Sequence, residues 1–206
     1  MILISEFKYF TKDVDKNAIV CSQIPQTRQE ERRVLDIEGL SKDTVYNVMR
    51  ELLYSFNYMW FLFEEVVKRT HSEGLESEEF RRLNEEFGSY EAKRLSRVID
   101  ISAGGIDALI QLLKHSHWAV FENIEIKRLT QKSFRMRTIE CSTQKAAKRW
   151  GMEYRACGPT GSLIRIGFFK RVNEKVKVQR IFTPPEIRPE DTPENVSCEW
   201  LISIEE

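Results

Sequence analysis

Apolar side chains recur every three to four residues between positions 41 and 67, which is typical of an amphipathic helix. Ser41 is a good N-cap, and Asp43 falls in the first turn, where the helix dipole favours a negative charge. We expect this helix to face a core over its whole length and to end at Gly74. Its apolar stripe comprises Val45, Val48, Met49, Leu52, Leu53, Phe56, Met59, Trp60, Phe63, Val66 and Val67.

Two further helices are predicted before residue 116. One begins near Ser77, a second N-cap candidate, and the other follows Gly104 and Gly105. The first of these should bury Phe80, Leu83, Phe87, Tyr90, Leu95 and Val98. The other should bury Ile106, Leu109, Ile110 and Leu113.

From Ala119 the pattern changes to the alternation that favours strands. Strands are predicted over residues 121–129, 132–141, 176–182 and 196–204. The final strand places Cys198 and Trp200 on one face and Glu199 on the other. Helices are predicted over residues 142–150, capped by Ser142 and ended by Gly151, and over residues 163–172.

This order of elements predicts an α+β fold. An N-terminal helical layer should pack on a C-terminal antiparallel sheet of about four strands with crossing helices. Residues 1–39 form an N-terminal appendage, and residues 40–206 form a single α+β domain. Within that domain, residues 41–116 are the helical half and residues 119–206 the sheet half.

Charge and composition exclude several classes of protein. The 206 residues include 32 Lys and Arg and 32 Asp and Glu, and this balance predicts neither nucleic acid nor an anionic membrane as a partner. No apolar run reaches the roughly 20 residues of a membrane helix. The N-terminal segment lacks the cleavage site of a signal peptide. We expect a cytoplasmic protein whose four cysteines are not disulfide-bonded.

Three cysteines form the first candidate for chemistry. Cys141 ends a strand before a helix N-terminus, a setting that lowers the pKa of a thiol. Cys157 precedes a Gly-Pro turn, and Cys198 shares a strand face with Trp200. These thiols are buried packing residues, zinc ligands, or in one case a reactive nucleophile, and the sequence leaves the three readings open.

Glu64 is the second candidate. On the first helix it follows Trp60 by one turn, so the aromatic ring could desolvate the carboxylate, raise its pKa and suit it to acid–base catalysis. The other reading places Glu64 and Glu65 at the solvated edge while Trp60 packs in the core. We expect His115 and His117 to contact a helix end rather than to bind a ligand.

An ordered set of short motifs runs from Leu40 to the C-terminus. It comprises the helix of residues 60–64, EAKRL at 91–95, CxxQ at 141–144, KRWG at 148–151, CxPxG at 157–161, the prolines 184, 185 and 189, and CxW at 198–200. In this order the chain resembles an uncharacterised family of prokaryotic cytosolic proteins grouped with L-2-amino-thiazoline-4-carboxylic acid hydrolase-like proteins. Its C-terminal half is similar to the ligand-binding domain of vinyl-reductase-type proteins.

The resemblance implies a pocket between sheet and helices and a dimer formed through the helical layer. Related proteins often carry a cysteine and a histidine where this chain has Thr183 and Arg188, so we assign no metal ligands, and the cofactor stays open. We expect a small apolar or amphipathic molecule to bind in the pocket. The expected binding residues are Trp60, Phe63, Gln144, Cys157, Cys198 and Trp200.

Two alternative functions remain. The first is a hydrolase of a small cyclic amidine or amide, with Cys141 as nucleophile or Glu64 as general base. The second is an interaction module that forms a homodimer through the helical half.

Overall fold

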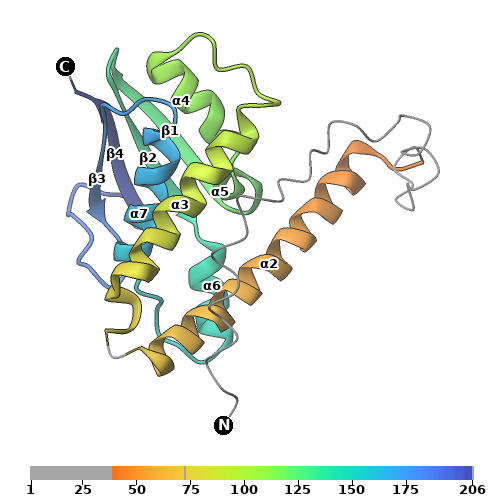
Figure 1. Ribbon diagram of the computed structural model, residues 1–206, viewed down its shortest axis with the longest axis vertical. Helices are drawn as coiled ribbons and strands as arrows, with labels where there is room; N and C mark the ends of the chain where they lie inside the picture. Colours follow the sequence, from red (N-terminus) through yellow and green to blue (C-terminus); the bar gives the residue numbers. More distant parts are fainter. Residues whose placement is uncertain (1–38, 72, 206) are drawn as a thin grey trace, which may run out of the picture. The chain divides into compact units, whose positions relative to one another are not determined.

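The computed structural model describes residues 39–71 and 73–205 (Figure 1). The chain divides into two compact units, residues 1–46 and residues 47–206. In the first unit the structure describes a turn at residues 39–40 and the beginning of helix α2 (Lys42–Thr70). The predicted appendage therefore lies outside the described residues apart from Gly39.

The N-terminus of α2 is capped as predicted, because Ser41 Oγ accepts a hydrogen bond of 3.1 Å from the backbone N–H of Thr44. The prediction that the whole apolar stripe faces a core is wrong. Leu52, Phe56 and Met59 are 58%, 62% and 59% exposed, whereas the buried residues of α2 are Phe61, Glu64 and Val67. The last turns of α2 make the aromatic contacts with other elements. The ring of Phe61 packs edge-on against that of Trp150, with 4.7 Å between the two ring centres.

Helix α3 (Glu78–Leu95) follows a single turn of 3-10 helix, η3 (Gly74–Glu76). Ser77 caps α3 as predicted, because its side chain accepts from the backbone N–H of Phe80. The predicted buried face is only partly right. Phe80 is buried, but Leu83, Phe87 and Tyr90 are exposed, and the buried positions recur every four residues at Phe80, Asn84, Gly88 and Ala92.

Glycine explains this choice of face, because α3 crosses helix α7 (Gly158–Lys170) at very short range. A Cβ atom added to Gly88 would lie 2.0 Å from the carbonyl oxygen of Ile164, and one added to Gly167 would lie 1.9 Å from that of Glu85. The two backbones can approach only where side chains are absent. A search for large apolar residues misses such an interface.

Helix α4 (Gly105–Leu113) begins where the pattern predicts, and it supplies Ile106, Leu109 and Leu113 to the core, whereas Ile110, which was also predicted to be buried, is only partly buried. A short helix that was not predicted, α5 (His117–Phe121), follows it. None of the described helices combines the length and apolar character needed to cross a bilayer.

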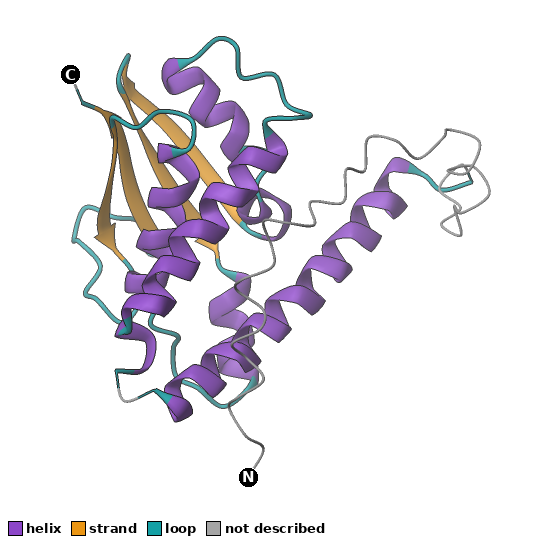
Figure 2. Cartoon of the chain, viewed as in Figure 1, coloured by secondary structure: helices purple, strands orange, loops and turns teal. Residues whose placement is uncertain are grey.

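The four predicted strands form one antiparallel sheet in the order β1-β2-β4-β3. They are β1 (Asn123–Thr130), β2 (Ser133–Glu140), β3 (Val176–Phe182) and β4 (Cys198–Ile204). Helices α3, α4 and α7 lie on one side of this sheet (Figure 2). The inner face buries Phe134, Met136, Trp200 and Ile202 against Phe168 and Phe169 of α7. The α+β architecture is confirmed.

The opposite face of the sheet holds an ion-pair network. Glu199 is only 2% exposed there, and its two carboxylate oxygens lie 3.0 Å from Arg135 Nε and 2.8 Å from Arg137 Nε. Because side chains alternate along a strand, Glu199 lies on the opposite face of β4 from Trp200, as predicted. Its burial depends on the two arginines, which neutralise the carboxylate from the neighbouring strand β2.

Helix α6 (Ser142–Arg149) ends as predicted. Gly151 has a φ of +77° and donates a hydrogen bond to Lys148, while Met152 donates to Ala147, which is the Schellman arrangement. The predicted N-cap is wrong by one residue. Cys141 occupies the N-cap position, and the side chain of Ser142 instead donates to Glu122 at 2.8 Å.

Candidate functional site

A cavity of about 130 Å³ lies among α2, α5, α7 and the inner face of β2 and β4, within residues 47–206. The structure brings most of the predicted site residues to its wall. These are Trp60 and Glu64 of α2, Trp200 of β4, and the cysteines 141, 157 and 198. Phe63 and Gln144 do not line it.

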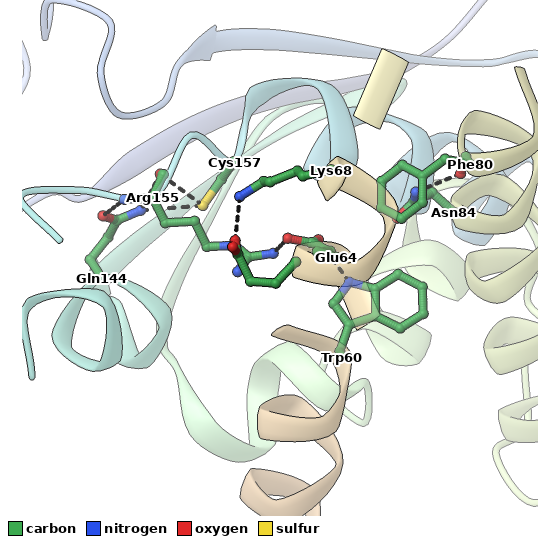
Figure 3. Close-up of polar contacts among 9 residues, drawn as sticks. Trp60, Glu64, Lys68, Phe80, Asn84, Gln144, Arg155 and Cys157 are labelled. Atoms are coloured by element: carbon green, nitrogen blue, oxygen red, sulfur yellow. Dashed lines mark hydrogen bonds and ion pairs between the residues drawn. The ribbon is translucent and has the colours of Figure 1, made fainter. Parts of the chain in front are cut away.

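Gln144 organises the loop behind the cavity. Its Oε1 accepts from the backbone N–H of Arg155 at 3.0 Å, and its Nε2 donates to the carbonyl oxygen of Arg155 at 2.8 Å. The same Nε2 lies 3.2 Å from Cys157 Sγ. Gln144 thus holds the loop that carries Arg155 and Cys157, and Figure 3 shows Arg155 between Gln144 and Glu64.

Glu64 is buried, with an exposed fraction of 1%. Trp60 Nε1 donates to its Oε1 at 2.9 Å, and Arg155 forms an ion pair with its Oε2. The reading that placed Glu64 at the solvated edge is wrong, although it holds for Glu65, which pairs with Lys68 in solvent. Periodicity identifies the helix face but does not reveal a distant arginine that makes burial of the carboxylate tolerable.

Arg155 is a site residue that the sequence did not indicate. Its guanidinium carbon lies 3.7 Å from the centre of the Phe61 ring, in cation–π contact. Burial lowers the pKa of Arg155 to about 10, so the side chain is still a cation at neutral pH. It therefore neutralises Glu64 on the cavity wall.

Cys141 and Cys157 are not activated as nucleophiles. Burial, reinforced by the nearby Glu122 carboxylate, raises the pKa of Cys141 far above its ordinary value. This is the reverse of the predicted lowering, because desolvation outweighs the hydrogen bond from the N-terminus of α6. Burial also raises the pKa of Cys157 to about 11. In the described part of the chain, no three His, Cys, Asp or Glu side chains are arranged to hold a metal ion.

Glu122 is a second carboxylate on the cavity wall. It accepts hydrogen bonds of 2.8 Å from both the backbone N–H and the hydroxyl of Ser142, and Cys141 Sγ donates to its Oε1 at 3.8 Å. Burial raises the pKa of Glu122 despite these bonds. It lies just beyond α5, a helix that the sequence pattern did not predict.

His117 also differs from its predicted role. It begins α5 rather than ending a helix, and its Nδ1 lies 2.6 Å from Glu91 Oε2 while its backbone N–H donates to Glu91 Oε1 at 2.7 Å. The centre of its ring lies 4.1 Å from that of Trp118, with the two ring planes tilted by 40°. The carboxylate of α3 therefore orients an imidazole at the cavity wall.

Arg165 reaches the cavity from α7 and is 5% exposed. Its guanidinium carbon lies 4.6 Å from the Trp118 ring and 4.2 Å from the Trp200 ring. Its Nη1 donates to the carbonyl oxygen of Gly161 at 3.1 Å, whereas its Nε has no hydrogen-bond partner among the described residues. Nothing in the apolar pattern of residues 163–172 distinguished this arginine.

Fold and site together define an α+β protein with a small cavity between its helices and its antiparallel sheet. Residues 38–204 match the family of unknown function DUF6125, and the chain belongs to this family. No curated protein and no solved structure matches the chain. The family match does not test the resemblance to L-2-amino-thiazoline-4-carboxylic acid hydrolase-like or vinyl-reductase-type proteins, which stays a prediction.

Proposed function

We propose that this protein binds a small amphipathic molecule in the cavity between helices and sheet. The observation that carries the proposal is the composition of the cavity wall. Trp60, Ile164 and the side chains of Cys141, Cys157 and Cys198 provide apolar contact, and a few polar groups, Arg165 and Glu122 among them, converge on the same space. Ligand sites commonly combine an apolar wall with a small number of placed polar groups.

The volume limits the size of the ligand. The cavity holds about 130 Å³, and in another protein a cavity of about 150 Å³ is enough to hold benzene. The ligand that fits without rearrangement is therefore compact, on the order of five to ten non-hydrogen atoms.

In keeping with the balanced charge, we place this function in the cytoplasm, with no nucleic acid as partner.

Native mass spectrometry of the purified protein, compared with denaturing mass spectrometry, tests the proposal. We expect a mass excess that disappears on denaturation. Thr160→Leu puts a larger apolar side chain on the cavity wall and should abolish the excess. Thr70→Leu, a matched change at an exposed position of α2, should retain it. An excess that persists unchanged in Thr160→Leu would contradict binding in this cavity.

A hydrolase of a small cyclic amidine or amide is the second candidate. One contact favours it, the hydrogen bond from Cys141 Sγ to Glu122 Oε1. As sulfur attacks the substrate carbon, ionised Glu122 would take the thiol proton, so that no resting thiolate is needed. Glu122 would then give this proton to the nitrogen that leaves, and water would cleave the carbon–sulfur bond and restore the thiol. Glu64 suits the role of general base less well, because Arg155 and Trp60 already occupy its oxygens.

Release of ammonia from 2-iminopyrrolidine, a small cyclic amidine, tests this second function. Cys141→Ala and Glu122→Gln should each abolish turnover, while Glu65→Gln, at an exposed position of α2, should leave it unchanged. Turnover that survives Cys141→Ala would exclude Cys141 as nucleophile.

A homodimer formed through the helical half is the third candidate. The exposed apolar residues Leu52, Phe56 and Met59 lie one helical turn apart on one face of α2. Contiguous apolar surface of this kind often marks a protein–protein interface. The occupant we propose for it is α2 of a second copy, in agreement with the dimer that the resemblance implies.

A further inference from the structure

Arg165 is a buried cation on the cavity wall that has no anionic partner among the described residues. Its side chain is 5% exposed, yet within residues 39–71 and 73–205 its one hydrogen bond is the contact of Nη1 with the carbonyl oxygen of Gly161. Its Nε is buried and has no partner in the part of the chain that the structure describes. The other arginine on the wall, Arg155, is paired with Glu64.

The aromatic neighbours of Arg165 hold its guanidinium in place without neutralising it. The ring centres of Trp118 and Trp200 lie 4.6 and 4.2 Å from its central carbon. Cation–π contact stabilises a cation through the ring quadrupole but supplies no net negative charge. A buried charge that lacks a counter-charge is costly, and proteins retain one chiefly where it has a function.

The acidic groups on the wall do not compensate Arg165 directly. The carboxylate of Glu64 is committed to Arg155 and to the indole N–H of Trp60. Glu122 acts on Arg165 through space but forms no ion pair with it among the described residues. Burial raises the pKa of Glu122 and therefore disfavours the charged form of this carboxyl group. Cys141 and Cys157 are neutral thiols for the same reason.

We infer that the ligand of this cavity carries a compact planar oxyanion, a carboxylate being the simplest, that pairs with the guanidinium of Arg165. Its apolar part would then lie against Trp60 and Ile164 on the cavity wall. The inference rests on the proposed function and adds to it the charge and the position of the ligand's polar group. An arginine fork suits such a group because it offers parallel N–H donors in one plane.

Three molecules of one shape and different charge test the inference: isobutyrate, isobutyramide and isobutyramidinium. Their affinities are measured by titration while the indole N–H resonances of the tryptophans are followed by NMR. We expect isobutyrate to bind about tenfold or more tightly than isobutyramide, as for a charge-assisted hydrogen bond in a buried site. Isobutyramidinium should bind weakest.

Arg165→Met removes the charge while keeping an unbranched side chain, and it should abolish the preference for isobutyrate over isobutyramide. Arg165→Lys should keep part of it, because lysine supplies the charge without the fork. Arg171→Met, at an exposed position just after the same helix, should leave it intact. Circular dichroism checks that each variant is folded, and Arg165→Met should melt no lower than the original protein because it removes an unpaired buried charge.

The outcomes separate the inference from the proposed function. Equal binding of isobutyrate and isobutyramide, or a preference for the amidinium, would overturn the inference and leave a binding cavity. A preference for isobutyrate that persists in Arg165→Met would also overturn it. If none of the three molecules binds, the proposed function fails for compact ligands, and the inference fails with it.

Discussion

Glu64 and Arg155 form a buried ion pair that joins α2 to the loop following α6. The guanidinium also lies over the ring of Phe61, and the backbone of Arg155 is held by the side-chain amide of Gln144. One side of the cavity wall is thus built by a long-range contact, of which the sequence pattern indicated Glu64 but not Arg155.

Removal of this carboxylate should destabilise the protein strongly. Glu64→Gln leaves the Arg155 cation buried and unpaired, which costs about 3–5 kcal/mol in comparable buried pairs. Chemical denaturation followed by circular dichroism measures the free energy of unfolding. Glu65→Gln, the neighbouring exposed carboxylate, should cost no more than about 0.5 kcal/mol. Equal losses for the two variants would contradict the structural role of the pair.

The crossing of α3 and α7 should not accept a methyl group. Gly88→Ala would place Cβ 2.0 Å from a backbone carbonyl oxygen of α7, so the helices must separate. Overpacking of this kind costs about 1–3 kcal/mol or more, and the melting temperature should fall by several degrees. Gly39→Ala, where no atom lies within 4 Å of the added Cβ, is the control. A stable Gly88→Ala variant would show that the two backbones are farther apart.

Glu122 should make stability decrease as the pH rises. Burial raises its pKa in the folded protein above the ordinary value of 4.5. Above pH 4.5 the unfolded chain has lost this proton while the folded protein still holds it, so unfolding releases a proton. The free energy of unfolding should therefore fall as the pH rises from 4.5 through the raised pKa.

Denaturation curves collected from pH 4 to 9 measure this slope. Glu122→Gln cannot ionise and should lose the part of the slope that Glu122 contributes. Glu174→Gln, an exposed carboxylate in the turn before β3, should retain it. The same slope in Glu122→Gln and in the original protein would show that Glu122 titrates normally.

The thiols should resist alkylation in the folded protein. With the pKa of Cys157 raised to about 11, the thiolate is scarce at pH 7.5. Reaction with iodoacetamide should be about a hundredfold slower than in the unfolded chain. Peptide mapping by mass spectrometry reports Cys141 and Cys157 separately. Rapid alkylation of folded Cys141 below pH 8 would contradict its raised pKa.

If α2 forms a homodimer, the melting temperature should rise with protein concentration. Phe56→Ser removes a large apolar side chain from the exposed face and should abolish that dependence. Val98→Ser changes another exposed apolar residue, 77% exposed beyond the end of α3, and should preserve it. Light scattering gives the mass directly, and a monomer at every concentration would exclude the dimer.

The sequence by itself determined most of the local architecture, with the exceptions of α5 and of the cap of α6. The caps at Ser41 and Ser77, the stop at Gly151 and the four strands are all where residue type and periodicity predict them. These features depend on interactions within a few residues along the chain, such as a side chain that accepts from the first turn or a glycine at positive φ. Local chemistry is therefore sufficient to predict them.

Only the tertiary structure decided which faces are buried and which polar groups the cavity holds. Gly88 selects the buried face of α3 because α7 approaches it, and Glu64 is buried because Arg155 neutralises it. Cys141 sits at the predicted helix N-terminus, yet its pKa rises rather than falls because burial depends on every element around it. Arg165 also belongs to the site only because tertiary packing brings it there. Its partners, Trp118 and Trp200, come from elements that the sequence order does not bring together.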